Sequence, residues 1–189
     1  MTVLLYPGAG SDSSHPSLVA AERWLAPHPC VRADFPYRKQ GRKAPDRAPV
    51  LLASIRDELS ELPVDQPLVM GGRSMGGRMC SMIAAGADGL PRPGNLKGLV
   101  LLCYPLHPPG KPEALRVEHL PAIDVPTLFI SGTNDTFGTP DELMRWTATM
   151  SPKAKVTHLW LEGKGHDLKG CDHTIAGAIR DFVDRVAKR

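Results

Sequence analysis

The sequence has no long apolar run, few cysteines and little net charge. No apolar stretch in its 189 residues approaches the length that crosses a bilayer, so we expect no contact with a membrane. The four cysteines are widely spaced and form no C-x-x-C pair. This spacing favours free thiols in a reducing cytosol over a disulfide framework or a zinc site. A formal charge of +3 is too small to indicate a nucleic-acid partner.

The composition is that of an ordinary globular protein, with 42% hydrophobic and 23% charged residues. A chain of this length is most simply one domain, and residues 1–189 contain no repeat, low-complexity tract or long linker. The first residues show neither a basic leader nor a small-residue cleavage site. We therefore expect a cytoplasmic protein that is a monomer or a homodimer.

Short apolar runs alternate with helical patterns along the whole chain. This alternation predicts one parallel α/β sheet with helices on both faces. The run at 98–103 is apolar throughout, which is typical of a strand covered on both sides. We predict strands at 3–6, 30–35, 68–70, 98–103, 125–131 and 156–161, and helices at 16–25, 49–62, 75–85, 140–151 and 175–186.

One serine lies where a predicted strand turns directly into a predicted helix. Ser74 stands between Gly72 and Gly76, after the apolar residues 68–70 and before an apolar helix. In a strand–G-x-S-x-G–helix turn the serine hydroxyl projects from the tip of the sheet, where a base and a substrate reach it. The bare pattern is equally typical of a glycine-rich turn with an incidental serine, so the surrounding sequence has to decide.

Two further polar residues directly follow later strands. Asp135 comes after the strand at 125–131, and His166 comes after the strand at 156–161. The carboxyl ends of parallel strands meet at one edge of a sheet, where the active groups of such folds lie. Taken singly, Asp135 is an ordinary turn residue and His166 an ordinary loop histidine. Their joint occurrence with Ser74, each after a strand, favours a shared site.

Three motifs contain these residues, namely Gly72-Arg73-Ser74-Met75-Gly76, Gly132-Thr133-Asn134-Asp135 and Gly165-His166. They look like the signatures of the α/β-hydrolase superfamily, and they occur in its order of serine, acid and histidine. The resemblance covers essentially the whole chain. Segments 35–37, 41–47 and 104–112 are also similar to signatures of a small cap-less branch. That branch includes bacterial dienelactone-hydrolase-like proteins, a testis-expressed relative and a subunit of a chromatin-associated acetyltransferase complex.

The resemblance implies a minimal α/β-hydrolase fold, with a six-stranded parallel sheet, helices on both faces and no lid domain. A site without a lid is shallow and open, which favours small or extended acyl substrates. The resemblance implies that Ser74 would be the nucleophile and that His166 would take its proton. Asp135 would hold the imidazole in the right tautomer. This chemistry requires no metal and no organic cofactor.

The resemblance also implies an oxyanion hole made by the backbone N–H groups of Met75 and Ala9. Many members of the superfamily have a His-Gly pair where this chain has Pro7-Gly8. We therefore expect the loop that carries Ala9 to be anchored by contacts of a different kind.

Residues 37–47 form a basic loop that follows the carboxyl end of a strand. Such a loop either attracts an anionic substrate or a phosphate-bearing acyl carrier, or is simply solvated. Arg42 in this loop, Arg73 in the serine turn and His107 in the proline-rich segment 104–112 are the candidate substrate-binding residues.

Two functions from different classes remain. The first is a serine hydrolase that cleaves a small carboxylic ester or thioester, with an anionic substrate as one option. The second is a catalytically idle binding or scaffold protein, because a fold does not fix a function. The set of Ser74, Asp135 and His166 favours the enzyme. A cysteine-dependent dienelactone hydrolase is disfavoured, because the turn holds a serine.

Overall fold

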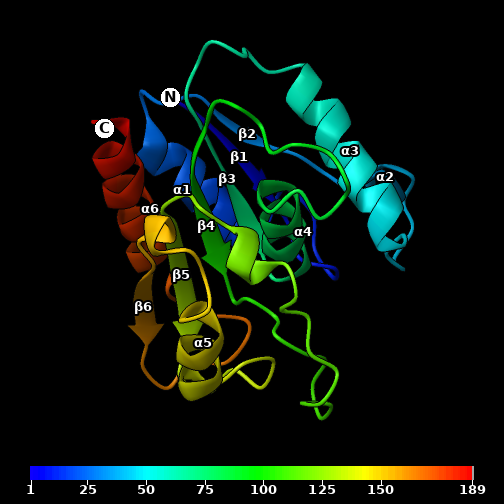
Figure 1. Ribbon diagram of the computed structural model, residues 1–189, viewed down its shortest axis with the longest axis vertical. Coiled ribbons are helices and arrows are strands. Elements are labelled where there is room, and N and C mark those ends of the chain that lie inside the picture. Colours follow the sequence, from blue (N-terminus) through cyan, green and yellow to red (C-terminus); the bar gives the residue numbers. More distant parts are fainter. Residues whose placement is uncertain (189) are drawn as a thin grey trace.

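A single sheet joins all the predicted strands in the computed structural model, which describes residues 1–188 (Figure 1). Each strand pairs in parallel with its neighbours, in the order β2-β1-β3-β4-β5-β6. The predicted six-stranded parallel sheet is therefore confirmed. The strands are β1 (Thr2–Tyr6), β2 (Cys30–Arg32), β3 (Leu68–Arg73), β4 (Leu96–Leu102), β5 (Thr127–Gly132) and β6 (Thr157–Leu161).

Helices cover both faces of the sheet, as expected. Successive side chains of a strand point to opposite faces, so Val3 and Leu5 of β1 pack on one side and Leu4 and Tyr6 on the other. The face with Val3 and Leu5 is covered by α1 (Pro16–Leu25) and α6 (Asp172–Ala187). The opposite face is covered by α3 (Ala48–Ser60), α4 (Met75–Ala84) and α5 (Pro140–Thr147).

The second strand is shorter than predicted, and the basic loop begins as a helix. β2 ends at Arg32, and the short helix α2 (Pro36–Lys39) follows it. The cause is the burial of Phe35 and Tyr37, which pack into the core with the rings of Tyr6 and Phe35 4.7 Å apart. Pro36 stands in the first turn of α2, where a missing N–H costs nothing.

Strand β1 lies between β2 and β3, so the chain reverses its direction of winding at β1 and β3. The loops that follow these two strands therefore diverge from a common crevice at the carboxyl edge of the sheet. In open α/β sheets this crevice is where ligands bind.

The turn between β3 and α4 lies directly against the end of β1. A Cβ atom on Gly72 would lie 2.1 Å from the carbonyl oxygen of Tyr6, and one on Gly76 would lie 2.5 Å from that of Pro7. Glycine is therefore required at both positions by the neighbouring strand. Ser74 itself has φ 44° and ψ −116°, a conformation that is strained for a residue with a side chain.

The long connection between β4 and β5, residues 103–126, contains only the short 3-10 helix η1 (Leu120–Ala122). A buried polar cluster ties this connection to α4. The Nε2 atom of His119 lies 2.8 Å from the Ser81 hydroxyl and 3.1 Å from the Tyr104 hydroxyl. No inserted lid domain occurs among residues 1–188, and the other short 3-10 helix is η2 (Pro152–Ala154).

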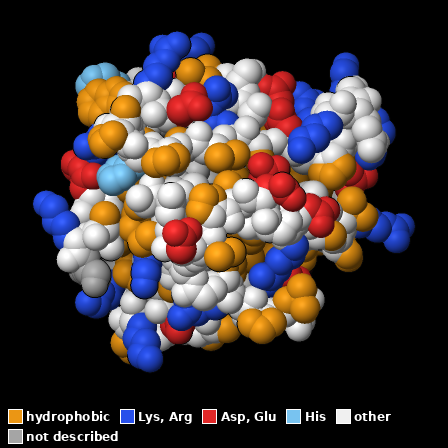
Figure 2. All heavy atoms as spheres, turned by 90° about the horizontal axis from the view of Figure 1, so that it is seen from above, with side chains coloured by type: hydrophobic (Ala, Val, Ile, Leu, Met, Phe, Trp, Pro, Cys, Tyr) orange, Lys and Arg blue, Asp and Glu red, His pale blue; other side chains and the backbone are white. Residues whose placement is uncertain are grey.

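The surface carries charges of both signs. On the face shown in Figure 2, Lys and Arg side chains are interspersed with acidic and apolar groups and do not merge into one basic area. None of the helices within residues 1–188 is both long enough and apolar enough to cross a membrane.

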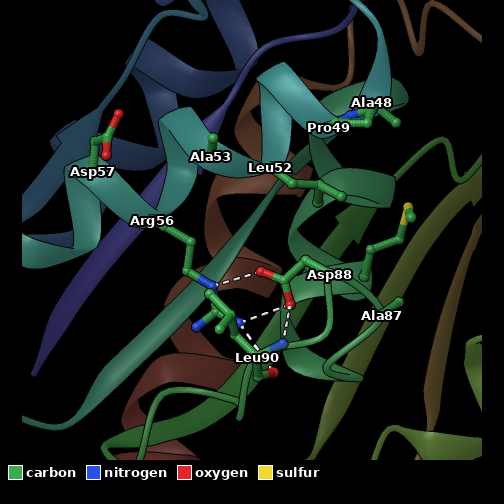
Figure 3. Close-up of a pocket in the computed structure, with 10 residues that line it drawn as sticks. Ala48, Pro49, Leu52, Ala53, Arg56, Asp57, Ala87, Asp88 and Leu90 are labelled. Carbon is green, nitrogen blue, oxygen red and sulfur yellow. Dashed lines mark hydrogen bonds and ion pairs between the residues drawn. The ribbon is translucent and has the colours of Figure 1, made fainter.

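A cavity of about 540 Å³ lies between α3 and the turn that follows α4 (Figure 3). Arg56 and Asp88 meet here in a two-pronged ion pair, with N–O distances of 2.7 and 2.9 Å. The positive charge of Arg56 in this cavity is therefore already compensated.

We predict that Gly76→Ala lowers the free energy of unfolding by at least about 2 kcal/mol, because the new methyl group would overlap two backbone carbonyls of the β1 end. Urea unfolding followed by circular dichroism measures the effect. Gly94→Ala is the control, because a Cβ at that position meets no atom within 4 Å. Equal stabilities of the two variants would contradict the close packing described above.

We also predict that His119 makes stability depend on pH. Burial lowers the pKa of His119 to about 4, below its ordinary value of 6.5. Between about pH 6.5 and pH 4, His119 is therefore protonated in the unfolded chain and neutral in the folded chain. The free energy of unfolding consequently falls as the pH drops through this range. The slope from this group approaches about 1.4 kcal/mol per pH unit.

The measurement is urea unfolding between pH 7.5 and pH 5, wild type beside His119→Gln. The variant should lose stability less steeply over this window. His15 and His158, whose pKa values are also lowered by burial, are present in both proteins and cancel in the comparison. Parallel curves would exclude the assignment to His119.

Candidate active site

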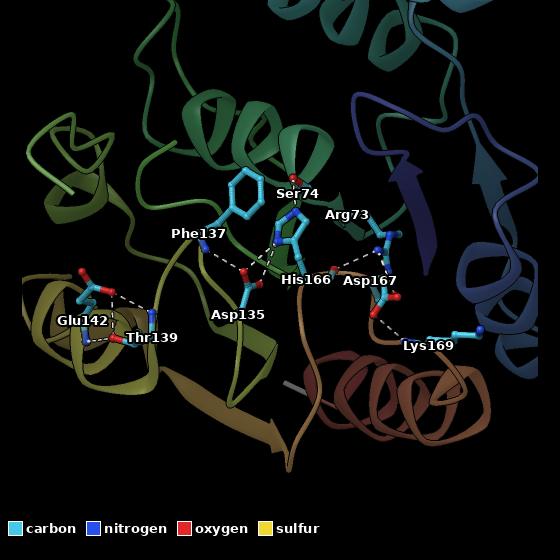
Figure 4. A network of polar contacts seen from close by, with 9 residues as sticks. All are labelled: Arg73, Ser74, Asp135, Phe137, Thr139, Glu142, His166, Asp167 and Lys169. Carbon is cyan, nitrogen blue, oxygen red and sulfur yellow. Dashed lines mark hydrogen bonds and ion pairs between the residues drawn. The ribbon is translucent and has the colours of Figure 1, made fainter. Parts of the chain in front are cut away.

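Ser74 lies at the carboxyl end of β3, immediately before α4. Its strained backbone turns the half-buried side chain toward the loop that follows β6. There the Oγ atom of Ser74 lies 2.9 Å from Nε2 of His166 (Figure 4).

The other ring nitrogen of His166 faces a buried carboxylate. Nδ1 lies 3.0 and 2.9 Å from the two carboxylate oxygens of Asp135, which is only 1% exposed. One of these oxygens also accepts a hydrogen bond from the backbone N–H of Phe137 at 2.9 Å. A carboxylate beside Nδ1 fixes the proton on that nitrogen and leaves Nε2 free to accept the hydroxyl proton of Ser74. This arrangement is able to remove a proton from a serine.

Phe137 holds the plane of the imidazole. Its ring stacks on His166 with centroids 3.9 Å apart and an interplanar angle of 25°. Sequence reasoning missed this residue. The available signal was its position two residues after Asp135, in a loop that already pointed to the site.

Two backbone N–H groups near Ser74 have no acceptor among the described residues. Neither Met75 nor Ala9 donates its N–H to a carbonyl within residues 1–188, and both residues line a cavity of about 300 Å³ together with Ser74. The buried Tyr37 donates its hydroxyl to the carbonyl oxygen of Ala9 at 2.9 Å. This contact anchors the loop after β1, and sequence reasoning did not find Tyr37.

Arg73 fastens the loop that carries His166. The side chain is 6% exposed, and its Nη2 group donates to the backbone carbonyls of His166 and Asp167 at 3.2 and 3.3 Å. Arg73 also lines a second cavity of about 400 Å³, which contains Ser74 and His166 in its wall. Arg73 therefore lies beside Ser74 and His166, and its hydrogen bonds hold the loop that carries His166, while its expected role in substrate binding stays a prediction.

The structure does not bring Arg42 or His107 to the cavities at Ser74. Arg42 is exposed and forms a two-pronged ion pair with Asp46 at 2.9 and 3.1 Å. His107 is buried beside α5, where its Nδ1 donates to the Pro108 carbonyl and its Nε2 lies 3.3 Å from a carboxylate oxygen of Glu142. Arg42 is held by a local partner, and the chain turns His107 toward α5 instead of the site.

Two arginines that sequence reasoning missed line the 300 Å³ cavity beside Ser74, namely Arg78 and Arg116. The signal for Arg78 was its spacing, because four residues after Ser74 on a helix lie on the same face. No comparable signal existed for Arg116, which lies in the irregular connection 103–126.

Metal-ligating side chains do not cluster in this structure. Within residues 1–188, no group of three or more His, Cys, Asp or Glu side chains is arranged to hold a metal ion. Over the same residues all four cysteines are free, which confirms the expectation of unpaired thiols.

Solved structures share this fold at low sequence identity. Est1E from Butyrivibrio proteoclasticus is 13% identical, with a TM-score of 0.76 over 100% of this chain and 88% of its own. Alpha/beta hydrolase domain-containing protein 10 from mouse is 15% identical, with a TM-score of 0.75 over 98% of this chain and 90% of its own. A monoacylglycerol lipase from Paleococcus ferrophilus is 15% identical, with a TM-score of 0.76 over 98% of this chain and 94% of its own.

These structures show the fold, and the sequence itself shows the family. Residues 1–188 match the sequence model of the family described as Alpha/beta hydrolase domain. The resemblance to the α/β-hydrolase superfamily is thereby confirmed, while the narrower resemblance to the cap-less branch stays a prediction. The chain, with its parallel sheet and its serine, histidine and aspartate at the strand ends, belongs to the alpha/beta hydrolase family.

Proposed function

We propose that this protein is a serine hydrolase that cleaves a carboxylic ester or a thioester through an acyl-enzyme. The observation that carries the proposal is the unbroken chain of contacts from Asp135 through His166 to Ser74, with a shortest distance of 2.9 Å at each step. A serine hydroxyl is too weak a nucleophile at neutral pH without such a base. Membership of a hydrolase family supports the same chemistry.

In the acylation step, Ser74 Oγ attacks the carbonyl carbon of the substrate while its proton passes to Nε2 of His166. The developing oxyanion accepts hydrogen bonds from the free N–H groups of Met75 and Ala9, and the amino end of α4 stabilises its negative charge. Asp135 stabilises the imidazolium that forms. The intermediate collapses when Nε2 returns the proton to the leaving oxygen or sulfur.

In the deacylation step, His166 removes a proton from a water molecule that attacks the acyl-serine. The second tetrahedral intermediate uses the same two N–H groups, and its collapse returns the proton to Ser74. The carboxylic acid then leaves. Arg73 acts as a positioning residue in this scheme, because its hydrogen bonds go to the backbone carbonyls of His166 and Asp167.

We predict that a fluorophosphonate probe labels the wild-type protein once, at Ser74. The Oγ–phosphorus bond forms as the phosphorus–fluorine bond breaks, and His166 takes the serine proton. Ser74→Ala should abolish labelling, and His166→Ala should slow it by on the order of 10³-fold or more. Intact-mass spectrometry measures both the stoichiometry and the rate.

Ser60→Ala is the matched control, because Ser60 is exposed at the end of α3 and its hydroxyl contacts only the Asp57 carbonyl. Labelling of this variant should equal that of the wild type. A folded wild-type protein that resists the probe would favour the alternative function, a catalytically idle scaffold with this fold.

We further predict that Asp135→Asn lowers kcat for a small test ester by on the order of 10³- to 10⁴-fold, because the amide no longer fixes the proton on Nδ1 of His166. Steady-state hydrolysis of 4-nitrophenyl acetate measures the loss. Asp141→Asn, which changes an exposed acid in the first turn of α5, should stay within about threefold of the wild type. Equal rates for the two variants would remove Asp135 from the mechanism.

A further inference from the structure

Two arginines without an anionic partner line the cavity beside Ser74. The cavity has a volume of about 300 Å³ and contains Arg78 from α4 and Arg116 from the connection 103–126 in its wall. The Nε atom of Arg78 is buried and has no hydrogen-bond partner within residues 1–188. Neither guanidinium takes part in any ion pair of the described chain.

The two positive charges are also close enough to disfavour each other. Burial is the largest influence on the pKa of Arg78 and lowers it, and the charge of Arg116 acts in the same direction, whereas Tyr104 and Glu118 act to raise it. Buried charges in proteins are normally paired, so an unpaired one beside a like charge is costly unless a ligand compensates it. A bound anion would supply that compensation.

Among residues 1–188, Asp46 is the one acid in the wall of this cavity, and it forms no ion pair with Arg78 or Arg116. Both of its carboxylate oxygens are taken by the guanidinium of Arg42. The contrast with the 540 Å³ cavity in Figure 3 is direct, because there Arg56 is compensated by Asp88. The 300 Å³ cavity therefore has in its wall two arginines that form no ion pair within residues 1–188.

The positions of the two cavities assign the two halves of an ester. His166 lines the 400 Å³ cavity and is absent from the wall of the 300 Å³ cavity. The leaving group must lie where His166 can protonate it, so it belongs in the 400 Å³ cavity. The acyl group then extends into the 300 Å³ cavity, which also holds Met75 and Ala9 beside the carbonyl.

The same cavity has apolar wall to receive the carbon chain of an acyl group. Leu51, Met79, Pro105 and Phe137 belong to the wall that Ser74 and the two arginines also line. A short methylene chain fits such a wall, and a charged end fits the two guanidinium groups. Guanidinium groups bind carboxylates in a two-pronged geometry that gives both affinity and orientation.

We propose that the substrate is a half ester or half thioester of a dicarboxylic acid, whose free carboxylate binds Arg78 and Arg116 while its acyl carbon faces Ser74. The inference rests on the proposed serine hydrolase. In this hydrolase, Arg78 and Arg116 are the residues that determine the specificity for an anionic acyl group.

The test compares two benzyl esters of equal chain length. Monobenzyl glutarate carries the free carboxylate, and benzyl pentanoate has a methyl group in its place. Release of benzyl alcohol, measured by chromatography at low salt, gives kcat/KM for each. The wild type should prefer the anionic ester by about tenfold or more, the effect of one charge-assisted hydrogen bond.

Arg78→Gln and Arg116→Gln should each bring the ratio of the two kcat/KM values toward one, chiefly through KM for the glutarate ester. Arg116→Lys should keep a clear preference, because it keeps the charge. Arg23→Gln is the matched control, an exposed arginine on α1 outside both cavities, and it should keep the wild-type ratio. Arg116 is half-buried in an irregular segment, so we expect its variants to fold. They test the proposal even if Arg78→Gln does not fold.

A second readout does not depend on turnover. Glutarate should slow fluorophosphonate labelling of the wild type and should protect the two glutamine variants far less. Inorganic phosphate is the competing anion, and stronger protection by phosphate than by glutarate would overturn the assignment of a carboxylate. Wild-type protein that is labelled but shows no preference for the anionic ester overturns this inference alone. Folded wild-type protein that is not labelled overturns the proposed function itself.

Discussion

The site depends on a close contact between the backbone at the end of β1 and a turn that carries no side chain where the two meet. Gly72 and Gly76 lie so close to the end of β1 that a methyl group at either position would overlap a carbonyl oxygen. This contact sets the loop after β1 beside the turn before α4, at the point where the winding of the sheet reverses. Ser74 and the free N–H of Ala9 share one cavity for this reason.

Much of the fold follows from local sequence, because buried parallel strands are apolar runs bounded by turn residues. The approach of Ser74, Asp135 and His166 is predictable on the same grounds, since each follows a strand and the carboxyl ends of parallel strands meet. The short helix α2 is different. The basic composition of 37–47 indicates a loop, whereas the burial of Phe35 and Tyr37 makes the segment begin as a helix.

The rest of the site was beyond sequence reasoning because it depends on the path of irregular segments. No periodicity describes residues 103–126, so the position of Arg116 beside α4 had no sequence signal. The expected role of Arg42 shows the reverse case. Its partner Asp46 lies four residues further on, and a local pair of this kind satisfies a charge before any ligand reaches it.

The polar cluster of Ser81, Tyr104 and His119 has a consequence for how this scaffold diversifies. It fastens the connection between β4 and β5 close to both of its ends, and it fastens them to the helix that follows Ser74. The residues between these fixed points, 105–118, contribute Pro105 and Arg116 to the wall of the 300 Å³ cavity and belong to no strand of the sheet. In the proposed serine hydrolase, a change in this segment would alter the wall of that cavity while Ser74, Asp135 and His166 keep their positions on other parts of the chain.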